Sequence, residues 1–177
     1  MEVDEQPFSF DNNGNLLNTT EQTNMFDVAN RLIETTRDEV TLQPIYDGNG
    51  NRVAQVKDGV MTNYALDTVS GLPEVIQTSE GHSYLHLPGV TIAESAAGER
   101  RYLLSDGLGS IRQAVDENAD VVSYHEFDSY GNPLQNGGSP YGYTGEWWEA
   151  EVGLLHLRAR WYMPETGTFL SVDAVET

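Results

Sequence analysis

A short unit recurs along this chain and limits what it can fold into. Each copy has an aromatic residue, then aspartate, then a glycine or asparagine two to four residues later, and then apolar residues. Its anchoring aspartates are separated by 16, 20 and 20 residues before a late copy appears. A repeat of about this length suits one β-hairpin per unit. The copies begin at Phe10, Phe26, Tyr46 and Phe127, with aspartates Asp11, Asp27, Asp47 and Asp128. A degenerate copy begins at Tyr64, with Asp67 as its aspartate.

The residue types of the unit are those of a tight turn between two strands. Aspartate and asparagine side chains accept hydrogen bonds from nearby backbone N–H groups, which forms an Asx-type turn. Glycines such as Gly14, Gly50 and Gly131 supply the positive φ that a tight hairpin needs. The aromatic residue ends one strand and points inward, and the apolar residues start the return strand.

Other segments have the length and residue types of strands. Residues 53–56, 73–78, 110–115 and 121–127 are rich in β-branched residues or alternate in polarity, and Asp116–Asp120 lies where a hairpin tip is expected. Residues 27–37 also carry apolar side chains at a helical spacing, but the repeat favours a strand over residues 31–36. We therefore predict an all-β strip of roughly eight to ten strands, with the repeat aromatics stacked from hairpin to hairpin on one face.

The composition excludes several classes of function. The 177 residues contain 9 Lys and Arg against 28 Asp and Glu, a formal net charge of -19. Nucleic-acid binding needs clustered basic residues, so neither nucleic acid nor an anionic membrane is an expected partner. Cysteine is absent, which excludes disulfides and thiolate metal sites. No apolar run is long enough to span a membrane, and the first residues do not resemble a signal peptide.

Two stretches near the C-terminus resemble a known family. Residues 102–112 contain Asp106-Gly107-Leu108-Gly109-Ser110, and residues 142–173 run from Gly142-Tyr143-Thr144-Gly145-Glu146 through Leu157-Arg158-Ala159-Arg160-Trp161-Tyr162 to Asp173. With the upstream units, they are similar to the YD repeats and the Rhs repeat-associated core of Rhs proteins. The resemblance implies a β-hairpin strip at 1–135, part of a spiral shell, closed by a core segment at 136–177 that packs on it as one unit.

The same resemblance implies several roles. Bacterial Rhs proteins, including the C components of Tc toxins, enclose a variable toxin in the shell, which makes them polymorphic toxins. In some members the core is an aspartyl autoprotease, and the animal teneurins act in adhesion. This sequence departs from the family pattern at Leu104, Gly107, Thr168 and Ala174, and Met163 replaces a family aspartate. It stops at Thr177, before the second D-P-x-G of the cut site, so we expect no self-cleavage.

Three aspartates remain weak catalytic candidates, Asp173 together with Asp106 or Asp128, since a close carboxyl pair can hold one ionised and one protonated member. The alternative for Asp173 is a hydrogen-bonded turn residue near the end of the chain. Residues with an expected structural role are the repeat positions Phe10, Asp11, Gly14, Phe26, Asp27, Tyr46, Asp47, Gly50, Phe127, Asp128 and Gly131, and the core positions Gly145, Glu146, Arg158, Arg160 and Tyr162.

Arg158 and Arg160 would share one face of a strand, either as a clamp for a carboxylate or as buried ion-pair partners of Glu146, Glu149 or a repeat aspartate. One residue of the pair Trp147 and Trp148 should pack inward, leaving the other as a candidate for sugar stacking. The loops at 47–51 and 116–120 alternate oxygen-bearing side chains, as calcium loops do, but Asx turns explain them better. No metal site and no cofactor is indicated.

We therefore expect a non-catalytic structural protein of a β-shell, secreted or at a bacterial cell surface when exported. Its expected partners are the rest of a larger Rhs/YD shell or copies of itself, joined by pairing of strand edges. The alternatives are an adhesive or self-assembling module that binds glycans or itself, and a residual aspartyl autoprotease.

Overall fold

A computed structural model describes residues 8–69, 72–87, 90–135 and 139–173. The described residues form two antiparallel sheets and one 3-10 turn, η1 (Tyr143–Gly145). The first sheet contains β1 (Ser9–Phe10), β2 (Leu16–Asn18), β3 (Gln22–Phe26), β4 (Leu32–Arg37), β5 (Val40–Tyr46), β6 (Arg52–Lys57), β7 (Val60–Asp67), β8 (Glu74–Thr78), β9 (Ser83–Leu87), β10 (Val90–Ala96), β11 (Glu99–Ser105), β12 (Ile111–Val115) and β13 (Val121–Tyr124). The second contains β14 (Trp147–Glu149), β15 (Leu154–Leu157), β16 (Arg160–Met163) and β17 (Thr168–Phe169).

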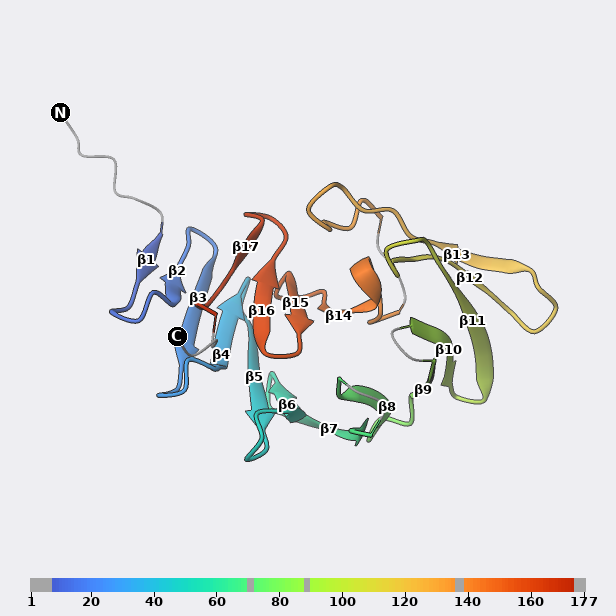
Figure 1. Cartoon of the computed structure of the whole chain (residues 1–177), viewed down its shortest axis with the longest axis horizontal. Helices are drawn as coiled ribbons and strands as arrows, with labels where there is room; N and C mark the ends of the chain where they lie inside the picture. Colours follow the sequence, from blue (N-terminus) through green and yellow to red (C-terminus); the bar gives the residue numbers. More distant parts are fainter. Residues whose placement is uncertain (1–7, 70–71, 88–89, 136–138, 174–177) are drawn as a thin grey trace.

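Every strand of the first sheet pairs with its neighbours in the sequence, so thirteen strands follow one another as a meander. Figure 1 shows these strands as an arch running from blue to yellow, with the orange and red strands of the second sheet inside it. The arch arises because antiparallel hairpins add strands at one edge and each added strand carries the right-handed twist of the sheet.

The ends of the strands form two rims along the arch, and most turns at one rim differ from those at the other. At one rim, five-residue turns begin at Asp11, Asp27, Asp47 and Asp106, between β1 and β2, β3 and β4, β5 and β6, and β11 and β12. At the other rim, β4 and β5, β6 and β7, and β10 and β11 are joined by two residues with positive φ, at Asp38–Glu39, Asp58–Gly59 and Ala97–Gly98, whereas β12 and β13 are joined there by a five-residue turn that begins at Asp116. Two central residues of positive φ define the type I′ hairpin turn. One repeat of about 20 residues therefore contains two strands and both kinds of turn.

The prediction of an all-β fold is confirmed, and residues 32–37 form β4 rather than a helix. The predicted number of strands was too low, because the described residues contain thirteen strands in one sheet and four in the other. Two features were missed. The I′ turns at Asp38–Glu39 and Ala97–Gly98 were not predicted, and the core segment forms a sheet of its own.

The predicted stacking of the repeat aromatics was wrong. Successive copies are two strands apart, about 9–10 Å, whereas ring contacts need centroids within about 7 Å. Among the described residues, the repeat aromatics instead contact the C-terminal segment, Tyr64 against Trp147 at 5.5 Å and Phe127 against Tyr143 at 5.7 Å. Phe10 is 60% exposed.

Two apolar cores join the arch to the second sheet. The first brings Leu16, Leu32 and Leu42 of the arch against Val152, Leu154, Trp161, Met163 and Leu170. The second brings Tyr64, Val75, Tyr84, Leu103, Ile111 and Ala114 against Tyr141 and Trp147. Each core draws side chains from both parts of the chain, so neither sheet buries its inner face without the other.

The late copy at Phe127 does not connect two strands of the arch. It follows β13 and closes on itself through a single bridge between Phe127 and Pro133. The turn then docks on the second sheet, because Asn132 Nδ2 donates to the carbonyl of Pro164 at 3.1 Å and Tyr162 Oη donates to the carbonyl of Tyr130 at 2.9 Å. This copy is therefore one of the contacts between the end of the arch and the C-terminal segment.

Candidate functional site

The aspartates of the repeat are acceptors for the backbone of their own turns. In the turn of Asp47, Oδ1 accepts the N–H groups of Asn49 and Asn51, both at 2.9 Å, and Oδ2 accepts the side-chain amide of Asn51 at 3.0 Å. Gly50 has φ 85° and donates its N–H to the Asp47 carbonyl. Both carboxylate oxygens are thus occupied within the turn.

Among the described residues, the complete bonding pattern is found at six places. In each, Oδ1 of the aspartate accepts the N–H groups two and four residues later, and the residue between them has positive φ. These turns begin at Asp11, Asp27, Asp47, Asp106, Asp116 and Asp128. The sequence indicated the Asx turns at the repeats and at Asp116. That Asp106-Gly107-Leu108-Gly109-Ser110 is another copy was missed, because the aromatic before the aspartate is replaced by Ser105.

These hydrogen bonds favour the ionised carboxylates. The side-chain amide of Asn51, followed by its backbone N–H, lowers the pKa of Asp47 below its ordinary value. The side-chain amide of Asn132 and then its backbone N–H lower the pKa of Asp128 in the same way. A carboxylate that serves as an acceptor for its own turn is poorly suited to proton transfer at neutral pH.

A buried ion pair lies where the two sheets meet. Arg52, at the start of β6, donates through Nη1 to Oε1 of Glu149 on β14 at 2.6 Å. The two side chains are 2% and 6% exposed. The Arg52 guanidinium also lies over the rings of Tyr64, Trp147 and Trp161, at 5.0, 5.3 and 5.2 Å from their centroids. No local pattern distinguishes Arg52 in the sequence, where it is one of several arginines that follow a repeat turn.

Arg158 forms a second junction between the sheets. Its Nη1 and Nη2 donate to the two carboxylate oxygens of Glu74 at 3.0 and 2.8 Å, and Nη1 also donates to the carbonyl of Pro73. Its Nε lies 3.1 Å from Oε2 of Glu146. Burial raises the pKa of Glu146, and the charge of Arg158 opposes this rise. One arginine therefore holds two carboxylates from opposite parts of the chain.

The expected common face of Arg158 and Arg160 is absent. Arg158 lies in the turn between β15 and β16 with φ 57°, and Arg160 is the first residue of β16. Arg160 pairs with Asp173 at 3.1 Å and lies 3.7 Å from the ring centroid of Phe169. The ion pair of Arg158 with Glu146 is present, whereas Glu149 pairs with Arg52. The prediction that both arginines share one face of a strand was wrong, because the chain reverses direction at Arg158.

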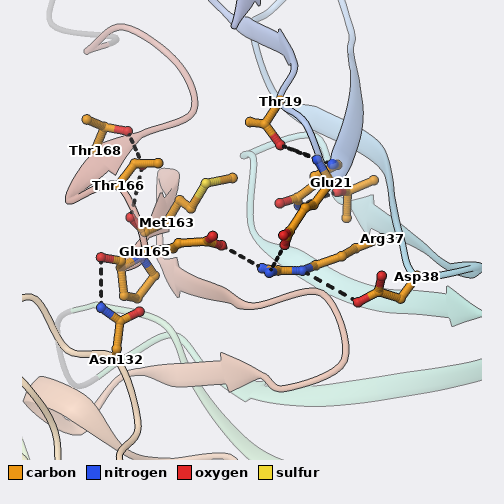
Figure 2. A network of polar contacts seen from close by, with 12 residues as sticks. Thr19, Glu21, Arg37, Asp38, Asn132, Met163, Glu165, Thr166 and Thr168 are labelled. Carbon is orange, nitrogen blue, oxygen red and sulfur yellow. Dashed lines mark hydrogen bonds and ion pairs between the residues drawn. The ribbon is translucent and has the colours of Figure 1, made fainter. Parts of the chain in front are cut away.

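Arg37 at the end of β4 joins three segments (Figure 2). Its guanidinium contacts Glu21 at 2.6 Å, Glu165 at 3.0 Å and Asp38 at 3.9 Å. Figure 2 shows Glu21 on the β2–β3 side and Glu165 on the turn after Met163, with Arg37 between them. Sequence reasoning did not single out this residue, because its partners lie far apart in the chain.

A cavity of about 330 Å³ lies between the repeat turns and the second sheet. Four of the nine basic residues of the chain line it, namely Arg31, Arg52, Arg158 and Arg160. His156 also lines it, and burial lowers the pKa of this imidazole well below its usual range. Within the described residues no group of histidines and carboxylates is arranged to hold a metal ion. No described helix is long and apolar enough to cross a membrane.

The three candidate catalytic aspartates lie apart in different elements. Asp106 holds the β11–β12 turn and contacts Arg112 at 2.8 Å, and Asp128 holds the turn after β13. Asp173 is 59% exposed on its side chain and contacts Arg160. No contact joins any two of these three carboxylates among the described residues. Met163 is 2% exposed in the first apolar core, so the residue at this position packs in the core.

The adjacent tryptophans point to opposite sides of β14. Trp147 is 8% exposed in the second core, and its Nε1 donates to Glu149 at 2.7 Å. Trp148 is half-buried beside Phe127 and Tyr143 at a hollow of about 260 Å³. Trp148 is therefore the residue of the pair that could contact a ligand from outside.

A search of protein families matches the teneurin YD-shell model over residues 1–177, and the chain belongs to this family. The resemblance to YD-repeat proteins is thereby confirmed. Among curated proteins, the tRNA3(Ser)-specific nuclease WapA of Bacillus spizizenii is 28% identical over 185 residues, covering 97% of this chain and 8% of that protein. The salivary gland surface protein 1 of Aedes aegypti is 25% identical over 142 residues, covering 75% of this chain and 4% of that protein.

Solved structures share the fold. The crystal structure of TcdB2-TccC3-Cdc42 matches with a TM-score of 0.69 at 18% identity, over 93% of this chain and 9% of that chain. The Tc holotoxin pore of Photorhabdus luminescens matches with a TM-score of 0.67 at 18% identity, over 92% of this chain and 9% of that chain. The chain thus spans less than a tenth of the length of these relatives, and its architecture is that of a segment of a YD shell.

Proposed function

We propose that this chain is a non-catalytic wall segment of a larger Rhs/YD-repeat shell, of the kind that encloses a toxin. One observation carries the proposal: six aspartates that could serve chemistry instead hold the backbone of the repeat turns. The second sheet fills the inner side of the arch, as a closing segment of a shell would. The segment acts by forming and closing a barrier.

The wall proposal requires that the chain does not cut itself. Intact mass should stay unchanged after long incubation at acid and neutral pH, because Asp173 has a basic partner and no carboxyl partner in the described structure. A clipped product that disappears in Asp173→Asn, and persists in the exposed control Glu117→Gln, would establish the autoprotease instead.

The WapA relatives are named as tRNA nucleases, so the proposal that this segment is non-catalytic can also be tested with tRNA. We propose that it does not reside in this segment, since a net charge of -19 disfavours binding of a polyanionic tRNA. Incubation with total tRNA should leave the tRNA intact, and cleavage above a buffer control would contradict the proposal.

Both edges of the arch support association with further strands. β1 and β13 each pair with one strand in the described chain, and β13 exposes Val121, Val122 and Tyr124. An unpaired strand edge is a template for another strand. We propose that these edges pair with adjoining parts of a shell, or with further copies of this chain in a secreted or surface assembly.

Sedimentation velocity over a range of concentrations distinguishes pairing with adjoining shell strands from pairing with further copies of this chain. Growth in mass that Val122→Lys abolishes would identify self-assembly, with Leu134→Lys as an exposed control outside the sheet. A monomer at all concentrations would leave adjoining shell strands as the proposed partner.

A further inference from the structure

One edge of the Arg52 guanidinium is buried without an acceptor from the described part of the protein. Nη1 donates to Glu149 at 2.6 Å and to Gln55 at 3.2 Å, whereas Nε and Nη2 have no hydrogen-bond partner there. The side chain is only 2% exposed. Buried donors are normally satisfied, so these two point to a ligand. The N–H groups of Nε and Nη2 lie side by side and form the fork that matches two oxygens of one carboxylate.

The fork is held in place before any ligand arrives. Tyr64, Trp147 and Trp161 surround the guanidinium at 5.0 to 5.3 Å, and Glu149 fixes its opposite edge. A preorganised donor loses little conformational freedom on binding, which favours affinity.

Arg52 lines the cavity of about 330 Å³ between the sheets. This volume lies at the lower end of the range for ligand pockets, about 300–1,000 Å³. His156 lines the same cavity, and its Nε2 also has no partner among the described residues. Arg52 and His156 therefore both bring buried polar atoms without hydrogen-bond partners to the same space, where Nε of Arg158 also lacks a hydrogen bond but lies 3.1 Å from Oε2 of Glu146.

The surroundings favour a monoanion over a dianion. Arg158, at the same cavity, already holds the carboxylates of Glu74 and Glu146, and Arg37 holds those of Glu21 and Glu165. Arg37 and Arg158 thus each pair with more than one carboxylate, whereas Arg52 pairs with Glu149 alone among the described residues. A phosphate dianion would meet stronger repulsion from these neighbouring acids.

We propose that the cavity is a binding site for a carboxylate group, held in bidentate fashion by Nε and Nη2 of Arg52 with His156 beside it. The carboxylate belongs either to a small free acid or to an aspartate side chain of a peptide. Both present the same two oxygens to the fork.

The test titrates the wild-type chain with acetate and, separately, with N-acetylaspartate amide, against sodium chloride at matched ionic strength. The readouts are the Nε–Hε resonance of Arg52 and the fluorescence of Trp147 and Trp161, which contact its guanidinium. A saturable change with acetate alone would identify a small acid, and tighter binding of the blocked aspartate would identify a peptide side chain. No saturable change with either probe, or saturation by inorganic phosphate alone, would overturn the proposal.

Arg52→Lys keeps a positive charge for Glu149 but removes the fork, so carboxylate affinity should fall roughly tenfold or more. Arg101→Lys, an exposed arginine outside the cavity, should leave affinity unchanged. His156→Phe keeps a ring against Trp161, which lies 4.8 Å away, and should weaken binding less than Arg52→Lys. If Arg52→Lys does not fold, the wild-type resonance decides alone. Unchanged affinity in a folded Arg52→Lys would refute the assignment.

Discussion

At the residue scale, the charged groups of this chain divide into two kinds. The repeat aspartates serve their own turns, whereas Arg37, Arg52 and Arg158 join segments far apart in the sequence. The first kind is local and was visible in the repeat unit. The second kind depends on residues brought together only by the curvature of the arch.

The buried pair of Arg52 and Glu149 yields the first prediction at this scale. Glu149→Ala should destabilise the fold by about 3–5 kcal/mol, because it leaves Arg52 charged and buried without its carboxylate. The double variant Arg52→Met with Glu149→Leu should recover most of that loss, since no buried charge remains. Urea unfolding followed by circular dichroism measures both. Equal losses in the single and double variants would show that the pair is not the cause.

At the element scale, the two turn types fix the register of the arch. The five-residue Asx turns and the I′ turns alternate along β3 to β7, so each strand begins and ends at a position set by its own turn. The Phe127 unit uses the same turn without extending the sheet. Its turn instead packs on the C-terminal segment, where Gly131 has φ 95° and faces the ring of Tyr143.

Gly131→Ala is the corresponding prediction. A methyl group there would clash with Tyr143 in addition to straining the backbone. We therefore expect the free energy of unfolding to fall by more than about 1 kcal/mol. Gly50→Ala is the matched control, because Gly50 has φ 85° and no atom near its missing Cβ. A smaller loss in Gly50→Ala isolates the contact with Tyr143. Equal losses would mean that backbone strain alone accounts for the effect.

Fold class and turn chemistry were predictable because both are local. Asp47, Gly50 and Asn51 carry their turn in five consecutive residues. The second sheet and the partners of Arg158 were not predictable in the same way. Glu74 is 84 residues from Arg158, and no local pattern connects them.

At the scale of the whole molecule, the arch and the second sheet share both apolar cores. We predict that residues 1–135 alone will not fold cooperatively, since Leu32, Leu42 and Tyr64 would lose the partners that bury them. Adding residues 136–177 as a separate peptide should restore dispersed amide resonances. A well-dispersed spectrum of the 1–135 fragment by itself would show that the arch is independently stable.

The stability of the fold should fall with acid over two pH ranges. Burial depresses the pKa of His156 below 6.5, so its contribution is complete above pH 6.5 and declines as pH falls toward its folded pKa. The turn aspartates Asp11 and Asp47 have folded pKa values below 3.8. Their contribution to stability is therefore complete above pH 3.8 and is lost below it. Urea midpoints measured across this range should show both declines. His156→Phe should reduce the upper decline, to which His125 still contributes because burial lowers its pKa too, and should leave the lower one unchanged. A midpoint independent of pH below 6.5 would contradict this account.

The sequence by itself determined the sheet, the repeat length and the turn chemistry, because aspartate, asparagine and glycine act on backbone groups within five residues. Only the tertiary structure decided what the aromatics and arginines contact. Curvature brings the inner face of the arch against the C-terminal strands, and burial there selects Glu149 for Arg52 and Glu74 for Arg158. Such pairings follow from distances in space, which the spacing of residues along the chain does not encode.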